Sequence, residues 1–254
     1  MKKVYFDINI YSNLQNNKEY YDIVLNSKNN SFKYYYSYYH IVDLETSQCR
    51  IDNLSFMENI VDDNYIDYLD EKIKYFNKKP TIFINHNTNF TENYNKKLKT
   101  EEFKNDILNK YNINNALLEY HINKREKIVR DKTEHKEYRR ELKFRMNKMS
   151  DKQLDELITC SLRNGYDKYY IILFIYKDIL DINENDSLKD TLSNEFKNIT
   201  MDSWHCCLGA SCDYIVTEDK RLKTKSEYIY KKLNINTKVY TLDKFIEEIK
   251  NNLN

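Results

Sequence analysis

Two short apolar segments, one near each end of the chain, both end on a carboxylate, and this feature constrains the fold most strongly. Residues 3–6 are followed by Asp7, and residues 214–217 are followed closely by Asp219. Both segments have the pattern of short buried strands. An open α/β sheet holds its ligands at the carboxyl ends of parallel strands. Several aspartates gathered there cannot all stay charged without a cation, so the pattern indicates a divalent metal site.

Alternation of strand-like and helical segments predicts the fold class. The expected strands are residues 3–6, 32–36, 79–84, 214–217 and 238–241. The third of these contains Pro80, which cannot donate to a ladder and is therefore expected at an edge of the sheet. Helical periodicity lies between or after these segments, which predicts an α/β fold: a parallel sheet sandwiched between helices on both faces.

The middle of the chain has a different pattern, which is helical from about residue 95 to residue 200. We therefore expect residues 1–90 and 200–254 to form the α/β core and residues 91–199 to form a helical insertion packed on it. Ser150 is the expected N-cap of one inserted helix, with Leu154, Leu157, Ile158 and Leu162 facing a core. The longest apolar run, residues 169–176, is too short to span a bilayer, so no membrane partner is expected.

Overall composition excludes some classes of function. The net charge is +1, so only local clustering of charge can indicate a nucleic-acid partner. Two glycines and one proline disfavour a Walker-type or dinucleotide-binding loop. The five cysteines form no disulfide framework or paired zinc pattern, which favours a reduced cytoplasmic location. Cys206, Cys207 and Cys212 are expected to pack as small apolar residues, with a redox or metal role as the alternative.

The candidate metal ligands are Asp7, Asp202 and Asp219, together with one acid from the helix that follows the second strand. Asp202 is expected to begin a helix, where the helix dipole favours a negative charge. The fourth acid is Asp43 or Glu45, because positions two apart on a helix point to nearly opposite sides. For each aspartate alone, a helix cap or a solvated turn is the alternative interpretation.

These segments, in this order, resemble those of PIN-domain nucleases. The strand-end Asp-x-Asn of that family matches Asp7 and Asn9, and its closing Thr-x-Asp matches Thr217 and Asp219. Asp202 matches the aspartate that opens the helix leading into the last motif. The resemblance covers roughly residues 1–50 and 200–250.

At the position of the family's second acid, this sequence departs from the family pattern. It is usually a glutamate about six positions after a strand-ending serine, and the position six after Ser37 holds Asp43. Some divergent PIN-like groups carry an aspartate there with a preceding histidine, as His40 precedes Asp43. We therefore favour Asp43 over Glu45 as the fourth acid.

The resemblance implies a pocket that binds Mg²⁺ or Mn²⁺ and hydrolyses phosphodiester bonds, most often in RNA. Two such ions about 4 Å apart can activate water and stabilise the leaving oxygen. The implied metal ligands and catalytic acids are Asp7, Asp43, Asp202 and Asp219. The residues that could orient them are Asn9, Ser37 and Thr217. His40 and His205 could contact the scissile phosphate or shuttle a proton, or else be hydrogen-bonded structural histidines.

A basic stretch at residues 124–148 is the candidate substrate-binding surface. Its arginines are Arg125, Arg130, Arg139 and Arg140. Phosphate contact is one interpretation, and a solvated helix with internal ion pairs is the other, because acidic residues interleave with the basic ones. The insertion could also form a lid, a homodimer surface or a face for a protein inhibitor or partner.

The leading hypothesis is a metal-dependent endoribonuclease that prefers RNA over DNA, with a toxin or defence effector as one form of it. The alternative from another class is a non-catalytic PIN-like module that binds RNA or protein. A third hypothesis is a metal-dependent phosphohydrolase that acts on small nucleotides. Filled acidic positions favour the enzyme over the binding module.

Overall fold

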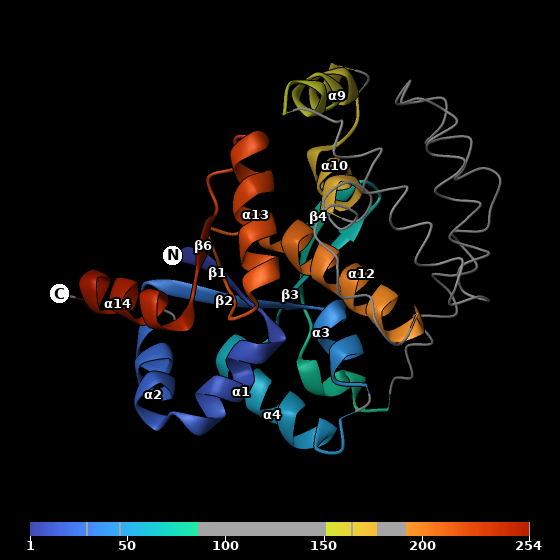
Figure 1. Ribbon diagram of the computed structural model, residues 1–254. Coiled ribbons are helices and arrows are strands. Elements are labelled where there is room, and N and C mark those ends of the chain that lie inside the picture. The colour runs from blue at the N-terminus through green and yellow to red at the C-terminus, as the bar shows by residue number, and fades with distance from the viewer. Residues whose placement is uncertain (29, 46, 86–150, 164, 177–191, 254) are drawn as a thin grey trace. The chain divides into compact units, whose positions relative to one another are not determined.

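The computed structural model (Figure 1) describes residues 1–85, 151–176 and 192–253, apart from residues 29, 46 and 164. The chain divides into two compact units. The first unit is Met1–Thr88 with Met201–Asn254, and the second is Asn89–Thr200. Each unit is described by itself.

The first unit is built on a six-stranded sheet in the order β4-β3-β2-β1-β5-β6. Its strands are β1 (Lys2–Phe6), β2 (Phe32–Ser37), β3 (Asn64–Leu69), β4 (Lys72–Asn77), β5 (Tyr214–Val216) and β6 (Lys238–Tyr240). All neighbouring strands are parallel except β3 and β4. The predicted α/β class with a parallel sheet is therefore confirmed.

Strand β1 lies at the centre, with β2 and β3 on one side and β5 and β6 on the other. Tyr5 is in register with Tyr35 of β2 and with Ile215 of β5. Strand order thus reverses between β1 and β5, and such a switch point opens a crevice at the carboxyl ends of the strands. Asp7 and Thr217 follow these two strands directly.

Helices flank the strands in chain order. The first unit contains α1 (Ile8–Asn16), α2 (Lys18–Ser27), α3 (Tyr38–Asp43), α4 (Arg50–Val61), the 3₁₀ helix η1 (Pro80–Phe83), α13 (Lys220–Lys232) and α14 (Leu242–Leu253). Helix α12 spans Leu192–Gly209, and its residues from Met201 onward belong to the first unit.

The two faces of the sheet have different surroundings because successive strand residues point to opposite sides. Val4 and Phe6 are buried in an apolar core with residues of α1, α2, α4 and α14, which Figure 1 shows on one side of the sheet. Tyr5 faces the other side, where α12 lies close to the strands. Gly209 permits this approach, because a Cβ atom there would lie 2.7 Å from Cδ1 of Ile215.

The predicted strand at residues 79–84 is wrong. Pro80 begins the 3₁₀ helix η1, a position where its missing N–H costs nothing. The edge strand is β4, which pairs with β3 in a hairpin whose turn residues, Asp70 and Glu71, have φ of 52° and 60°. Two central residues with positive φ are typical of a type I′ hairpin, which usually carries Asn or Gly and so gave no sequence signal here.

The described part of the second unit contains α9 (Asp151–Arg163) and α10 (Lys168–Phe174). Leu154 and Ile158 are buried as predicted, whereas Leu162 is 47% exposed and Ser161 is buried in its place. The predicted N-cap Ser150 and the side chain of Leu157 lie outside the part of the chain that the structure describes.

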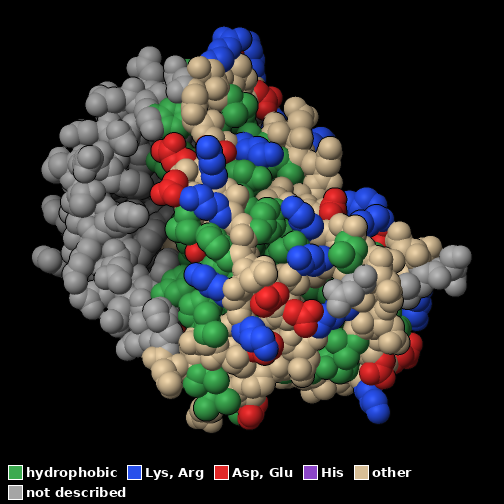
Figure 2. All heavy atoms as spheres, turned by 180° about the vertical axis from the view of Figure 1, so that it is seen from behind, with side chains coloured by type: hydrophobic (Ala, Val, Ile, Leu, Met, Phe, Trp, Pro, Cys, Tyr) green, Lys and Arg blue, Asp and Glu red, His purple; other side chains and the backbone are tan. Residues whose placement is uncertain are grey.

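The described surface is mixed in character. On the face shown in Figure 2, basic and acidic side chains of the described residues intermingle with hydrophobic ones. Within the described ranges, no helix combines the length and apolar composition needed to cross a lipid bilayer.

Candidate active site

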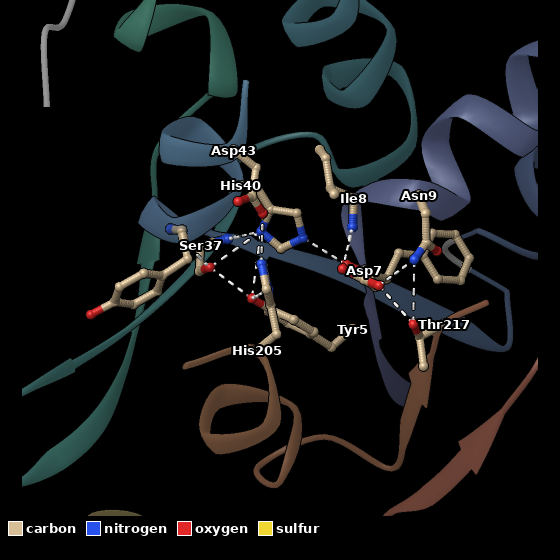
Figure 3. A network of polar contacts seen from close by, with 11 residues as sticks. Tyr5, Asp7, Ile8, Asn9, Ser37, His40, Asp43, His205 and Thr217 are labelled. Carbon is tan, nitrogen blue, oxygen red and sulfur yellow. Dashed lines mark hydrogen bonds and ion pairs between the residues drawn. The ribbon is translucent and has the colours of Figure 1, made fainter. Parts of the chain in front are cut away.

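Asp7 is held in one orientation by neutral donors (Figure 3). It caps α1, where its Oδ1 accepts from the backbone N–H of Ile8 at 2.7 Å. Its Oδ2 accepts from the amide of Asn9 and, at 2.6 Å, from the Thr217 hydroxyl. Burial raises the pKa of Asp7, while His205 and the Thr217 hydrogen bond act in the opposite direction. The carboxylate is therefore well positioned, although burial disfavours its charge.

Thr217 connects Asp7 to Asp219. Its hydroxyl donates to Asp7 and accepts from the backbone N–H of Asp219 at 3.0 Å. Asp219 caps α13, since its Oδ1 accepts from the N–H groups of Arg221 and Leu222 at 2.7 and 2.9 Å. The positive end of the helix dipole favours a negative charge at this position.

Asp202 lies inside α12, so the prediction that it begins a helix is wrong. The helix begins at Leu192, and the free N–H groups of a helix start are therefore not near Asp202. Burial and the negative charges of Asp219 and Asp7 raise its pKa to about 7, with His205 opposing. Its carboxylate makes no hydrogen bond or ion pair with the side chains that the structure describes.

Asp43 is the last residue of α3, and its Oδ2 lies 2.8 Å from Nε2 of His205. Asp43 also contributes to the raised pKa values of Asp7 and Asp202. Glu45 lies beyond the end of the helix, in the turn that follows. Burial lowers the pKa of His205, but the hydrogen bond and charge of Asp43, with the charges of Asp7 and Asp202, outweigh it and raise the pKa overall.

His40 is a buried neutral histidine with a defined tautomer. Its Nδ1 accepts from the backbone N–H of Ser37 at 3.0 Å, in the capping box that begins α3. Because Nδ1 is an acceptor, Nε2 carries the proton and donates to the Phe6 carbonyl at 2.6 Å. Burial and the charge of His205 lower the pKa of His40 to about 3. His40 thus provides a hydrogen-bond donor for the carbonyl of Phe6, the last residue of β1.

Tyr5 belongs to the polar network of the candidate site, and sequence reasoning missed it. Its hydroxyl lies 2.7 Å from Ser37 Oγ and 2.8 Å from His205 Nδ1. Ser37 was expected to orient a carboxylate, but its hydrogen bonds to described side chains go to Tyr5 and His40. A tyrosine in a strand is an ordinary core residue. The only available signal was its alternation with Val4 and Phe6, which places it on the face opposite to theirs.

The acids are close enough to influence one another's charge, but they are not arranged as a ready ligand set. Within the described ranges, no three His, Cys, Asp or Glu side chains are placed so that they could hold a metal ion. No described Lys or Arg forms an ion pair with any of the four aspartates. The residues fit a hard divalent cation in donor type and in excess negative charge, because such ions prefer carboxylate oxygens.

Three of the cysteines are buried as thiols near the site. Cys206, Cys207 and Cys212 are buried, and burial raises the pKa of Cys206 and Cys212 to about 12, which keeps both as thiols. This agrees with apolar packing. The predicted phosphate-binding residues Arg125, Arg130, Arg139 and Arg140 lie outside the described residues.

Comparison of the chain with protein-family models, with curated proteins and with solved structures finds no match in any of the three. The class of protein therefore follows from the fold and the site alone. They define an α/β protein with a cluster of aspartates at the switch point of its parallel sheet.

Proposed function

We propose that the protein is a metal-dependent nuclease of the PIN-like kind that hydrolyses phosphodiester bonds, with RNA as the favoured polymer. One observation carries this proposal. Thr217 joins Asp7 to Asp219 at the carboxyl ends of β1 and β5, and Asp202 completes the acidic cluster from α12. Nuclease sites that use hard cations need such oxygen donors in one place.

The position of the cluster supports the PIN-like interpretation. The Asp-x-Asn pair follows the central strand, and the Thr-x-Asp pair follows its parallel neighbour. The amide of Asn9 and the hydroxyl of Thr217 both donate to the same oxygen of Asp7. These are the orienting roles that the resemblance implies for them.

The chain's own residues would perform the following tasks. Asp7, Asp202 and Asp219 would hold Mg²⁺ or Mn²⁺, with Asp43 as the fourth predicted ligand. When bound, such ions supply an activated water and stabilise the leaving oxygen of a phosphodiester. Asn9 and Thr217 keep Asp7 in one orientation, and the N-terminus of α13 does the same for Asp219.

The charge on Asp202 favours the enzyme over the non-catalytic binding module. A partly buried carboxylate whose neighbours are other carboxylates destabilises the fold unless a cation offsets it. A module that binds RNA or protein at another surface has no use for a carboxylate that destabilises its fold. A metal-dependent site needs that carboxylate as a ligand. The helical insertion, the arginine contacts, a homodimer and a protein inhibitor remain predictions.

Cleavage assays on the full chain test the proposal. Labelled single-stranded RNA, single-stranded DNA and duplexes would be incubated with Mn²⁺, with Mg²⁺ and with EDTA. We expect cutting of RNA with either ion and none with EDTA. Asp7→Asn and Asp219→Asn should each lower the rate by about 1000-fold, as removal of a main charge-stabilising group does.

Asp22→Asn is the matched control, because Asp22 is an exposed carboxylate on α2. The Asp22→Asn variant should cleave RNA at the wild-type rate. Tight RNA or protein binding without any cleavage would favour the binding module. Cleavage of free nucleotides but of no polymer would favour the small-molecule phosphohydrolase.

A further inference from the structure

A buried histidine–carboxylate pair lies at the junction of α12, α3 and β1. His205 of α12 is 1% exposed, and its two ring nitrogens contact different elements. Nε2 lies 2.8 Å from Oδ2 of Asp43, and Nδ1 lies 2.8 Å from the Tyr5 hydroxyl. The ring therefore connects the end of α3 to the centre of the sheet (Figure 3).

His205 has no free nitrogen for a substrate. A group that transfers a proton to a reacting atom must lie within hydrogen-bond reach of it. Both nitrogens of His205 are already engaged by protein groups inside the fold. Its contacts instead fix the rotation of α12, to which the neighbouring Trp204 adds by stacking on Tyr39 of α3 with ring centroids 4.7 Å apart.

The position of His205 determines the position of Asp202. The two residues are three apart on α12, so they lie on the same face of the helix. Asp202 makes no hydrogen bond with the described side chains that could hold it by itself. The attachment of α12 through His205 is therefore one of the contacts that keep Asp202 on the side of Asp7 and Asp219, together with the stacking of Trp204 and the close packing of Gly209.

Asp43 is the acid that this attachment uses. An ionised carboxylate only accepts hydrogen bonds, so Nε2 of His205 carries the proton of the pair. A cation that drew Asp43 away would leave a buried N–H group without its acceptor, which is costly. Among the described residues, the hydrogen bonds to the carboxylates of Asp7 and Asp219, in contrast, come from neutral amide, hydroxyl and backbone donors, so no counter-charge from this part of the chain is bound to either group.

We propose that Asp43 is a positioning residue and not a cation ligand: it holds His205 of α12, and the cation-binding acids are Asp7, Asp202 and Asp219. This inference rests on the proposed function, and it differs from the sequence-based prediction that all four aspartates bind metal. Asp43 acts through His205 on the placement of Asp202.

Binding of Mn²⁺ to the full chain, measured by calorimetry, separates the two roles. Asparagine at position 43 can still accept from Nε2 of a neutral His205, whereas alanine cannot. Loss of an orienting partner costs about 10- to 100-fold in metal affinity, so Asp43→Ala should fall in that range and Asp43→Asn should lose about threefold. Asp202→Asn and Asp219→Asn should lose about 100-fold or more, as ligands. Asp22→Asn should bind as the wild type does.

Two outcomes would overturn the proposal. One is a loss in Asp43→Asn equal to that in Asp202→Asn, which would make Asp43 a ligand. The other comes from ¹⁵N spectra of the histidine rings, with the His205 signals assigned by their absence in His205→Gln. We expect a protonated Nε2 whose signal stays unchanged when Mg²⁺ saturates the site. An unprotonated Nε2 would show that His205 does not donate to Asp43. A shift of the Nε2 signal on addition of Mg²⁺, to the value of a ring without a hydrogen-bond acceptor, would show that the cation takes Asp43 from His205.

The same spectra distinguish failure of this inference from failure of the proposed function. If the wild type binds neither Mn²⁺ nor Mg²⁺, the nuclease proposal fails. The protonation of Nε2 in the wild type, and its response to Asp43→Ala, would still decide whether Asp43 holds His205.

Discussion

The two halves of the polar network at the ends of β1 and β5 use opposite means to accommodate buried charge. The first half, which we name the acid half, consists of Asp7, Asn9, Thr217 and Asp219. The second, which we name the histidine half, consists of Tyr5, Ser37, His40, Asp43 and His205. In the acid half, amide, hydroxyl and backbone donors orient the carboxylates without neutralising them. In the histidine half, an imidazole faces a carboxylate.

This difference shows which part of the network is open to an outside cation. Neutral donors fix geometry and leave the negative charge in place, whereas the Asp43–His205 pair balances its charge internally. Burial and the charges of Asp219 and Asp7 raise the pKa of Asp202, and in our proposal the histidine half orients it. In our proposal the acid half therefore binds the cation and the histidine half positions Asp202.

Among the variants that test this comparison and leave every acid in place, the largest expected effect comes from breaking the acid half at its centre. Thr217→Val keeps the shape of the side chain but removes the hydroxyl that joins Asp7 to Asp219. The rate of metal-dependent RNA cleavage should fall by about 100-fold, because Asp7 loses an orienting donor and the backbone N–H of Asp219 loses its acceptor. Thr237→Val is the control, since its hydroxyl donates to the carbonyls of Ala210 and Cys212 away from the acids. An equal loss of rate in both variants would contradict the special role of Thr217.

A smaller effect is expected for Asp202→Asn, which should raise the free energy of unfolding, whereas Thr217→Val lowers the rate of cleavage. Its pKa is raised from 3.8 to about 7, so between these values the folded chain binds more protons than the unfolded chain. The free energy of unfolding without metal therefore falls as pH rises through this window, and the full penalty applies above it. Discounted for partial exposure, Asp202→Asn should stabilise the metal-free chain by about 1–2 kcal/mol at pH 8.

Urea unfolding in EDTA at pH 8 and at pH 4 measures this effect. The gain should disappear at pH 4, where Asp202 is protonated in the folded chain, and Asp22→Asn should show no gain at either pH. Destabilisation by Asp202→Asn at pH 8 would show that this carboxylate is not crowded by its neighbours.

The smallest expected effect tests the histidine half. Tyr5→Phe removes a buried hydroxyl and leaves His205 Nδ1 and Ser37 Oγ with one partner fewer, which should cost about 1 kcal/mol in the free energy of unfolding. Tyr34→Phe is the matched control, since its hydroxyl bonds Ser27 on the other face of the sheet. Both variants should lose stability, but only Tyr5→Phe should also slow cleavage. If Tyr5→Phe and Tyr34→Phe cleaved RNA at the same rate, the Tyr5 hydroxyl would have no role in cleavage.

Much of the acid half could be predicted from the sequence because its geometry is local. Asp7 and Asn9 lie within one turn after β1, and Thr217 and Asp219 lie just beyond β5, so their order along the chain indicates their place at the sheet edge. The parallel order of β1 and β5 then brings them together. Caps, strand ends and short spacings are properties that neighbouring residues determine.

The histidine half depends on contacts that no local pattern specifies. His205 and Asp43 are 162 positions apart, and Tyr5 and His205 are 200 apart. Their pairing depends on how α12 packs on α3 and β1, which is a long-range property. The start of α12 at Leu192 rather than at Asp202 was also missed. The β3–β4 hairpin was missed for a related reason, since Asp70 and Glu71 adopt positive φ without the usual turn residues.

The stacking of Trp204 on Tyr39 has a practical consequence. Trp204 is the single tryptophan of the chain, and it is next to His205 on α12. Its indole emission therefore reports on one place in the fold, where α12 meets Tyr39 of α3 and Tyr68 of β3, against a background of 24 tyrosines. The unlabelled protein thus carries its own optical probe for any shift of the helix that bears Asp202.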